Sequence, residues 1–178
     1  MGSVKNFEQE KLIIGIMYTN PTHYQIAIKI LIDIFGEIDV VSDEYIFSNY
    51  SNYYNKEMNG IVLRRFVSFY NCQDPASLAD IKLKTNDIER KLADNGQRII
   101  NLDPCLLSHG KFIMATTKSA SFRIPLNYGI YAELSLVYTK GTWAHFYWTY
   151  FDIKTDFFKG YLCKVRSVYL EQRKVWRV

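Results

Sequence analysis

The feature that most constrains the fold is a short, uninterrupted apolar segment near the start of the chain. Residues 12–18 have the sequence LIIGIMY, and three of the seven are isoleucine. A run of this length and β-branched content, without polar alternation, is typical of a strand that is covered on both faces. It is also far shorter than the ~20 residues of a transmembrane helix. The segment therefore predicts a buried central strand.

Two amphipathic helices are predicted after this strand. Isoleucines recur every four residues within residues 23–35, and Gly36 is a typical C-cap. The second helix is predicted to begin after Asp74, a good N-cap, and to end at the Asn-Gly pair at 95–96. A polar stripe lies beside its apolar stripe, at Lys82, Asn86 and Glu89.

The remaining pattern predicts short strands and one more helix. The strand candidates are residues 38–41, 45–47, 61–70, 98–103, 111–117, 121–126 and 130–139, and the helix covers residues 157–169. The predicted fold class is α+β, with a mainly antiparallel mixed sheet of six to seven strands, two long helices and a C-terminal helix, the helices lying on one face. The opening order β-α-β-β-α-β predicts a ferredoxin-like start. With 178 residues and no linker, the chain is expected to form one domain, 1–178.

Charge and cysteine usage exclude several classes of protein. The net charge of +4 is too small to indicate nucleic-acid binding by itself, although basic residues concentrate after residue 153. The three cysteines and three histidines are scattered, without disulfide or zinc spacing. Reduced thiols and a polar N-terminus favour a cytoplasmic protein with no membrane segment.

Strand arithmetic predicts a polar row in the second half of the chain. If residues 121–126 and 130–139 form a hairpin, Arg123 lies opposite Glu133, on the same face of the sheet. The preceding turn, at Lys118, would then bring Thr116 or Thr117 beside Arg123. In one interpretation Arg123 binds a phosphate or carboxylate and Glu133 acts as a base. In the other, the two residues form an ordinary cross-strand ion pair on a solvated face.

A second polar cluster follows Arg98. On a strand, Asn101 and Asp103 share a face, and two oxygen-bearing side chains at this spacing suit Mg²⁺ held together with a substrate phosphate. Magnesium is the only cofactor that the sequence suggests. The alternative is that Asp103 precedes Pro104 simply because the strand ends there.

A third cluster joins a tyrosine-rich loop to a strand. Residues 49–60 include Tyr53, Tyr54 and Glu57, and Arg64 follows on the next strand. Tyrosines and an arginine are suited to stacking on a nucleotide. Alternatively, this loop and the basic C-terminal helix are the surface of a non-catalytic module that binds RNA or a protein.

Taken together, these motifs resemble one uncharacterised prokaryotic family, catalogued as a domain of unknown function, number four-four-one-six. The residues that support the resemblance are Asn52-Tyr53-Tyr54, Glu57-Met58, Arg64-Arg65-Phe66, Ile81-Lys82, Thr85-Asn86, Glu89, Arg98, Asn101 to Pro104, Ala115 to Lys118, Arg123-Ile124, Gly129 to Glu133, Trp148 to Tyr150 and Asp152. Members are often labelled GTP-binding proteins, which implies GTP as a further alternative ligand. The chain has no GxxxxGK[ST] phosphate loop.

The function predicted from the sequence is binding, with hydrolysis or transfer as an option, of a small phosphate-bearing or other anionic metabolite. The predicted catalytic residues are Glu133 and Asp103, and the predicted ligand-binding residues are Arg98, Asn101, Thr116, Thr117, Lys118, Arg123, Arg64 and Glu57.

Overall fold

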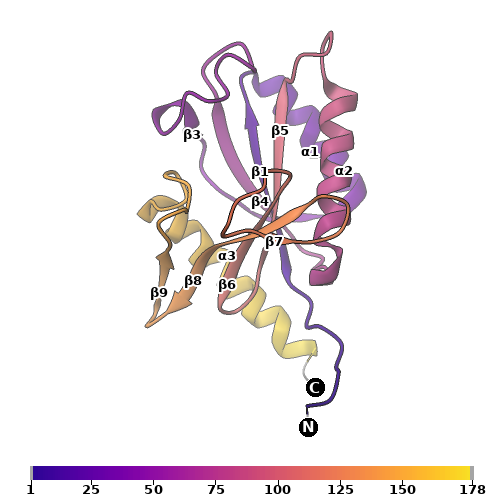
Figure 1. Cartoon of the computed structure of the whole chain (residues 1–178), viewed down its shortest axis with the longest axis vertical. Coiled ribbons are helices and arrows are strands. Elements are labelled where there is room, and N and C mark those ends of the chain that lie inside the picture. Colours follow the sequence, from indigo (N-terminus) through magenta and orange to yellow (C-terminus); the bar gives the residue numbers. More distant parts are fainter. Residues whose placement is uncertain (1, 177–178) are drawn as a thin grey trace.

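The computed structural model describes residues 2–176, which form nine strands and three α-helices (Figure 1). The helices are α1 (Pro21–Phe35), α2 (Leu78–Leu92) and α3 (Asp156–Trp176), with two short 3₁₀ helices, η1 (Phe47–Asn49) and η2 (Pro75–Ser77). The strands are β1 (Lys11–Tyr18), β2 (Ile38–Val41), β3 (Tyr45–Ile46), β4 (Leu63–Phe69), β5 (Ile100–Leu107), β6 (Lys111–Thr116), β7 (Ile124–Pro125), β8 (Tyr131–Thr139) and β9 (Thr142–His145).

All nine strands belong to one sheet, whose main path has the order β2-β4-β1-β5-β6-β8-β7. β3 pairs with β4, and β9 pairs with β8, outside this path. Every pairing in the described part of the chain is antiparallel. The α+β class and the large antiparallel sheet are thus confirmed. The main path has seven strands, the upper end of the predicted six to seven; β3 matches the candidate at 45–47 but lies outside this path, and β9 was not predicted.

The sheet has helices on both faces, so the prediction of helices on one face is wrong (Figure 1). Leu12, Ile14 and other even-numbered residues of β1 pack in one apolar cluster with residues of α1 and α2. Ile13, on the opposite face, packs in a second cluster with Phe158 and Leu162 of α3. Because both faces are covered, every residue of β1 is buried. The apolar run therefore becomes a central strand, as predicted.

Local capping fixes where the first two helices begin. The side chain of Asn20 accepts a hydrogen bond from the Thr22 amide at the start of α1. Asp74 accepts one from the Ala76 amide, and the short η2 then leads into α2. Both caps satisfy amides that have no partner within the helix.

β5 does not end at Asp103, as the alternative interpretation of the sequence proposed, but continues through Pro104 to Leu107. It pairs with β6 only from Cys105 to Leu107. The Ser108 amide donates to the Lys111 carbonyl, and hydrogen-bonded pairs alternate from there along the hairpin. Pro104 would be the donor opposite Ala115, but proline has no N–H. The ladder stops there, and the two strands separate beyond it.

The three predicted strands at the end of the sheet do not form a simple meander. β8 lies between β6 and β7, and pairs with both. β8 has nine residues and β7 only two, so β6 forms a much longer ladder with β8 than it could with β7.

Candidate functional site

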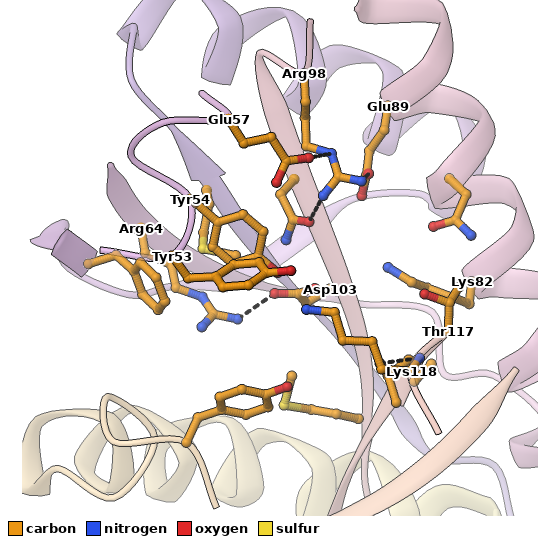
Figure 2. Close-up of a pocket in the computed structure, with 18 residues that line it drawn as sticks. Tyr53, Tyr54, Glu57, Arg64, Lys82, Glu89, Arg98, Asp103, Thr117 and Lys118 are labelled. Atoms are coloured by element: carbon orange, nitrogen blue, oxygen red, sulfur yellow. Dashed lines mark hydrogen bonds and ion pairs between the residues drawn. The ribbon is translucent and has the colours of Figure 1, made fainter. Parts of the chain in front are cut away.

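A polar cavity of about 190 Å³ lies where β5 and β6 separate (Figure 2). We call this gap, between residues 101–104 of β5 and 115–118 at the end of β6, the β5–β6 opening. The walls come from both strands, from α2, from the tyrosine-rich loop before β4, and from Tyr150. Segments far apart in the sequence therefore contribute to one concave site.

The structure brings eight of the ten predicted site residues to this cavity, and they come from four separate segments of the chain. They are Glu57, Arg64, Arg98, Asn101, Asp103, Thr116, Thr117 and Lys118. The other two, Arg123 and Glu133, are not among its lining residues.

Arg64 forms the closed side of the cavity. Its guanidinium is 2% exposed and donates to Asp152 at 2.7 Å and to Asp103 at 2.8 Å. Tyr45 donates a further hydrogen bond to Asp152. Space for this network depends on Gly15 of β1, where a Cβ atom would lie 2.8 Å from a terminal nitrogen of Arg64. The charge of Arg64 is thus neutralised by the protein itself.

Two side chains of α2 replace the missing strand partner at the β5–β6 opening. Lys82 donates to the Leu102 carbonyl at 2.8 Å, and Glu89 accepts from the Leu102 amide at 2.7 Å. Burial raises the pKa of Glu89, against the opposing effects of Lys82, the Leu102 amide and Arg98. The free edge of β5 is therefore satisfied without β6, and the gap stays open.

Arg98 lies at one end of the cavity, between Glu57 and Glu89 (Figure 2). It also donates to the Asn101 side-chain oxygen at 2.9 Å, which fixes the orientation of that amide. The amide nitrogen of Asn101 consequently has no acceptor in the described part of the chain, although Asn101 is only 3% exposed. A buried donor without a partner is uncommon and requires a physical explanation.

Lys82 and Lys118 are the two cations of the cavity that are not in direct contact with a carboxylate. Among residues 2–176 neither ammonium has a carboxylate within 4.0 Å. The Lys118 ammonium lies 4.3 Å from the centre of the Tyr53 ring, within the range of a cation–π contact. Burial, with Asp103 nearby, raises the pKa of Tyr54, so that phenol keeps its proton at neutral pH.

Arg123 and Glu133 lie opposite each other, as the hairpin arithmetic predicts, since Ile124 pairs with Ala132 in the same register. The ion pair is buried, with a nitrogen–oxygen distance of 2.8 Å. The rest of the predicted row is wrong. Because β8 is the middle strand, Met114 rather than Thr116 or Thr117 lies on the other side of Glu133.

The Arg123 guanidinium has further partners that connect it to the cavity. It donates to the Lys118 carbonyl at 2.8 Å and to the Tyr150 hydroxyl at 3.1 Å. Lys118 and Tyr150 both line the cavity. Arg123 thus contacts two cavity residues without lining the cavity itself.

The oxygens proposed for magnesium already have protein partners. Asn101 and Asp103 do share a face of β5, but they accept hydrogen bonds from Arg98 and Arg64 respectively. Within residues 2–176 there is no group of three or more His, Cys, Asp or Glu side chains arranged to hold a metal ion. Magnesium binding stays a prediction.

The cavity residues that were absent from the predicted site include Lys82, Asn86, Glu89 and Tyr150. The first three form the polar stripe of the second helix, with spacings of four and three residues. A polar stripe directly beside the apolar stripe of a helix indicates that the polar side chains also face the protein interior. This pattern could have placed the three residues in the site. For Tyr150 the sequence gives no comparable signal.

The alternative of an open binding surface depends on the basic residues of α3. Arg166 donates to the His109 carbonyl, Arg173 pairs with Glu8, and Lys174 pairs with Glu171 of the same helix. Tyr53 and Tyr54 line the cavity instead of extending a surface of α3. The RNA and protein alternatives stay predictions.

The fold and the site define an α+β domain with a largely polar cavity in an opening of its antiparallel sheet. The chain belongs to the family described as Domain of unknown function (DUF4416), whose model matches residues 8–169. No curated protein and no solved structure matches the chain. None of the described helices combines the length and apolar character needed to span a membrane.

Proposed function

We propose that the cavity at the β5–β6 opening binds a small phosphate-bearing or other anionic metabolite, with Lys82, Lys118 and Asn101 as its contacts. The observation that supports this most strongly is the Asn101 amide nitrogen, buried in the cavity wall without an acceptor. A bound anion would supply that acceptor. It would also neutralise Lys82, a 6% exposed lysine whose ammonium has only a backbone carbonyl as its recorded partner.

The distribution of charge favours the lysines over the arginines as ligand contacts. The two terminal nitrogens of Arg64 are bound to Asp103 and Asp152, although its Nε has no acceptor in the described chain, and Arg98 is shared between Glu57 and Glu89. An ammonium without a carboxylate partner attracts an anion more strongly than an arginine already bound to carboxylates.

The size of the cavity supports a small ligand or the anionic head group of a larger one. Its volume of about 190 Å³ lies below the roughly 300–1,000 Å³ of sites that enclose drug-sized molecules. We therefore favour a phosphate or carboxylate group over enclosure of a whole GTP molecule.

Within this proposal Arg123 and Glu133 are positioning residues. Arg123 holds the backbone at Lys118 and the hydroxyl of Tyr150 in place, and Glu133 holds Arg123. Asp103, whose carboxylate faces the cavity but is bound to Arg64, is the residue we favour for any proton transfer to or from the ligand.

Calorimetric titration with inorganic phosphate tests the proposal. Wild type should bind phosphate, and Lys82→Met should weaken binding roughly 10–100-fold, because a hydrogen bond to a charged group contributes ~1.5–3 kcal/mol. Asn101→Asp should also weaken binding, since it removes the free donor but keeps the oxygen that Arg98 needs.

Lys84→Met is the matched control, because Lys84 is exposed on the same helix and is not among the cavity residues. It should bind phosphate as wild type does. Lys82→Met also removes the donor to the Leu102 carbonyl, so it should lower the stability of the ligand-free protein by about 1–3 kcal/mol, and urea denaturation checks that the variant is folded before titration. Phosphate binding that is absent in wild type, or equal in Lys82→Met, would rule out the proposed site.

We also propose that the first half of the chain is a ferredoxin-like unit. The element order from β1 to β5 and the sheet order β2-β4-β1-β5 support this, with the short β3 as an addition.

A further inference from the structure

A second cavity, of about 490 Å³, adjoins the first on the side of Arg98. The two cavities have five lining residues in common: Glu57, Asn86, Glu89, Arg98 and Thr117. Because these residues face both spaces, the cavities are neighbours separated only by side chains.

The separating wall is formed mainly by Arg98 and its two carboxylate partners. Arg98 is 34% exposed, and its distances to Glu57 and Glu89 are 3.3 and 3.4 Å, longer than a strong charge-assisted hydrogen bond. The Arg98–Glu57 pair is exposed on both sides, and an ion pair of this kind contributes little free energy. Figure 2 shows the Arg98 side chain reaching between the two carboxylates from the end of the cavity. A change of the Arg98 rotamer that gives up its contacts with Glu89 and Asn101 would open this wall.

The second cavity differs from the first in chemistry. It lacks the aromatic wall of Tyr53, Tyr54 and Tyr150, and no lysine is among its described lining residues. Asn86 and Thr117 line both cavities, whereas Gln97 and Arg90 are the polar side chains that line only the second. Side chains that both donate and accept hydrogen bonds are suited to hydroxyl groups of a ligand.

From this geometry we infer that the two cavities form one elongated site for a phosphorylated polyol, such as a sugar phosphate. The phosphate occupies the cavity of Lys82 and Asn101, and the hydroxyl groups lie beyond Arg98, against Gln97 and Asn86. This inference rests on the proposed function and adds the class of ligand to it.

Competing probes of different length test the inference by calorimetry: inorganic phosphate, ribose 5-phosphate and ribose. Wild type should bind ribose 5-phosphate roughly tenfold or more tightly than phosphate, as expected for two added hydrogen bonds. Ribose alone should bind weakest, because it lacks the group that the lysines attract.

Two variants act on the second cavity alone. Gln97→Ala removes a hydrogen-bonding group, and Ala93→Phe fills space, and neither residue lines the first cavity. Both should lower the affinity for ribose 5-phosphate towards that for phosphate, while phosphate affinity stays at the wild-type value and reports correct folding.

The outcomes separate the inference from the proposed function. Equal affinities for phosphate and ribose 5-phosphate, or a preference that survives both variants, would overturn the elongated site and leave the anion site standing. If Lys82→Met loses phosphate affinity but the second-cavity variants have no effect, the elongated site is likewise overturned and the anion site stands. Phosphate binding that is absent, or that does not depend on Lys82, would overturn both.

Discussion

The two sides of the cavity both present positive charge, yet they use it differently. On the closed side, Arg64 is bound to Asp103 and Asp152, and these two carboxylates neutralise its charge. On the open side, Lys82 and Lys118 lie beside the gap in the sheet without a carboxylate within 4.0 Å in the described chain. The difference indicates that the charge of the arginine is used within the fold, whereas the charge of the lysines remains available for a ligand even though Lys82 also binds the Leu102 carbonyl.

This comparison separates two readouts, stability and binding. A group whose partners are all supplied by the protein should affect the free energy of unfolding when it is removed. A group that lacks such partners should affect ligand binding with little loss of stability. The following predictions change the closed side first, then the support beneath it, then the open side.

The largest effect is expected for Arg64→Ala. Removing this guanidinium leaves two carboxylates, one of them fully buried, without their cation, and should lower the free energy of unfolding by about 3–5 kcal/mol. Urea denaturation measures it. Lys174→Ala, which breaks an exposed ion pair with Glu171, should cost no more than about 0.5 kcal/mol. Similar losses in the two variants would show that Arg64 is not a structural ion-pair centre.

A smaller loss is expected for Gly15→Ala. The added methyl group would lie 2.7 Å from the Phe66 ring and 2.8 Å from Arg64, so the closed side must shift, at a cost of about 1–3 kcal/mol. The matched control is Gly160→Ala in α3, where a Cβ meets nothing within 4 Å. That change should stabilise the protein by roughly 0.5–1 kcal/mol. Thermal unfolding of both variants checks the opposite signs.

The smallest effect concerns the pH dependence of stability through Glu89. Burial raises its folded-state pKa above the ordinary 4.5, so the folded protein holds this proton more tightly than the unfolded chain. Stability linked to Glu89 is therefore greatest below pH 4.5 and falls as the pH rises through the folded-state value. Glu89→Gln removes the titration.

The measurement is the unfolding free energy of wild type and Glu89→Gln at several pH values on both sides of 4.5. The wild type should lose stability relative to the variant as the pH increases. The reverse trend would mean that Arg98 and Lys82 outweigh burial and hold Glu89 ionised.

Local chemistry made much of the fold predictable. The LIIGIMY segment, the cap residues Asn20-Pro21 and Asp74-Pro75, and the apolar stripe of α3 each depend on neighbours in the sequence. The same holds for the facing of Arg123 and Glu133, because a short hairpin fixes its own register. Eight of the residues that the sequence suggested for a site, from their types and spacing, line one cavity, and their role in a site stays a prediction.

The wrong predictions, of a simple meander and of helices on one face, both concern contacts between segments that are distant in the sequence. Whether β6 pairs with β7 or with β8, and whether α3 covers the face opposite α1 and α2, depends on which surfaces are buried together. The stripe of Lys82, Asn86 and Glu89 was visible, but its role depends on the edge of β5 that it faces.

The sequence by itself determined the central strand, the three helices, the Arg123–Glu133 pair and most of the polar residues of the site. Only the tertiary structure decided that these polar residues surround a cavity. Pro104 supplies the local reason, since it has no N–H to continue the ladder with β6. The opening also requires Lys82 and Glu89, brought from α2 to bind the Leu102 backbone. Satisfying a buried strand edge is a contact between distant segments, which no local pattern specifies.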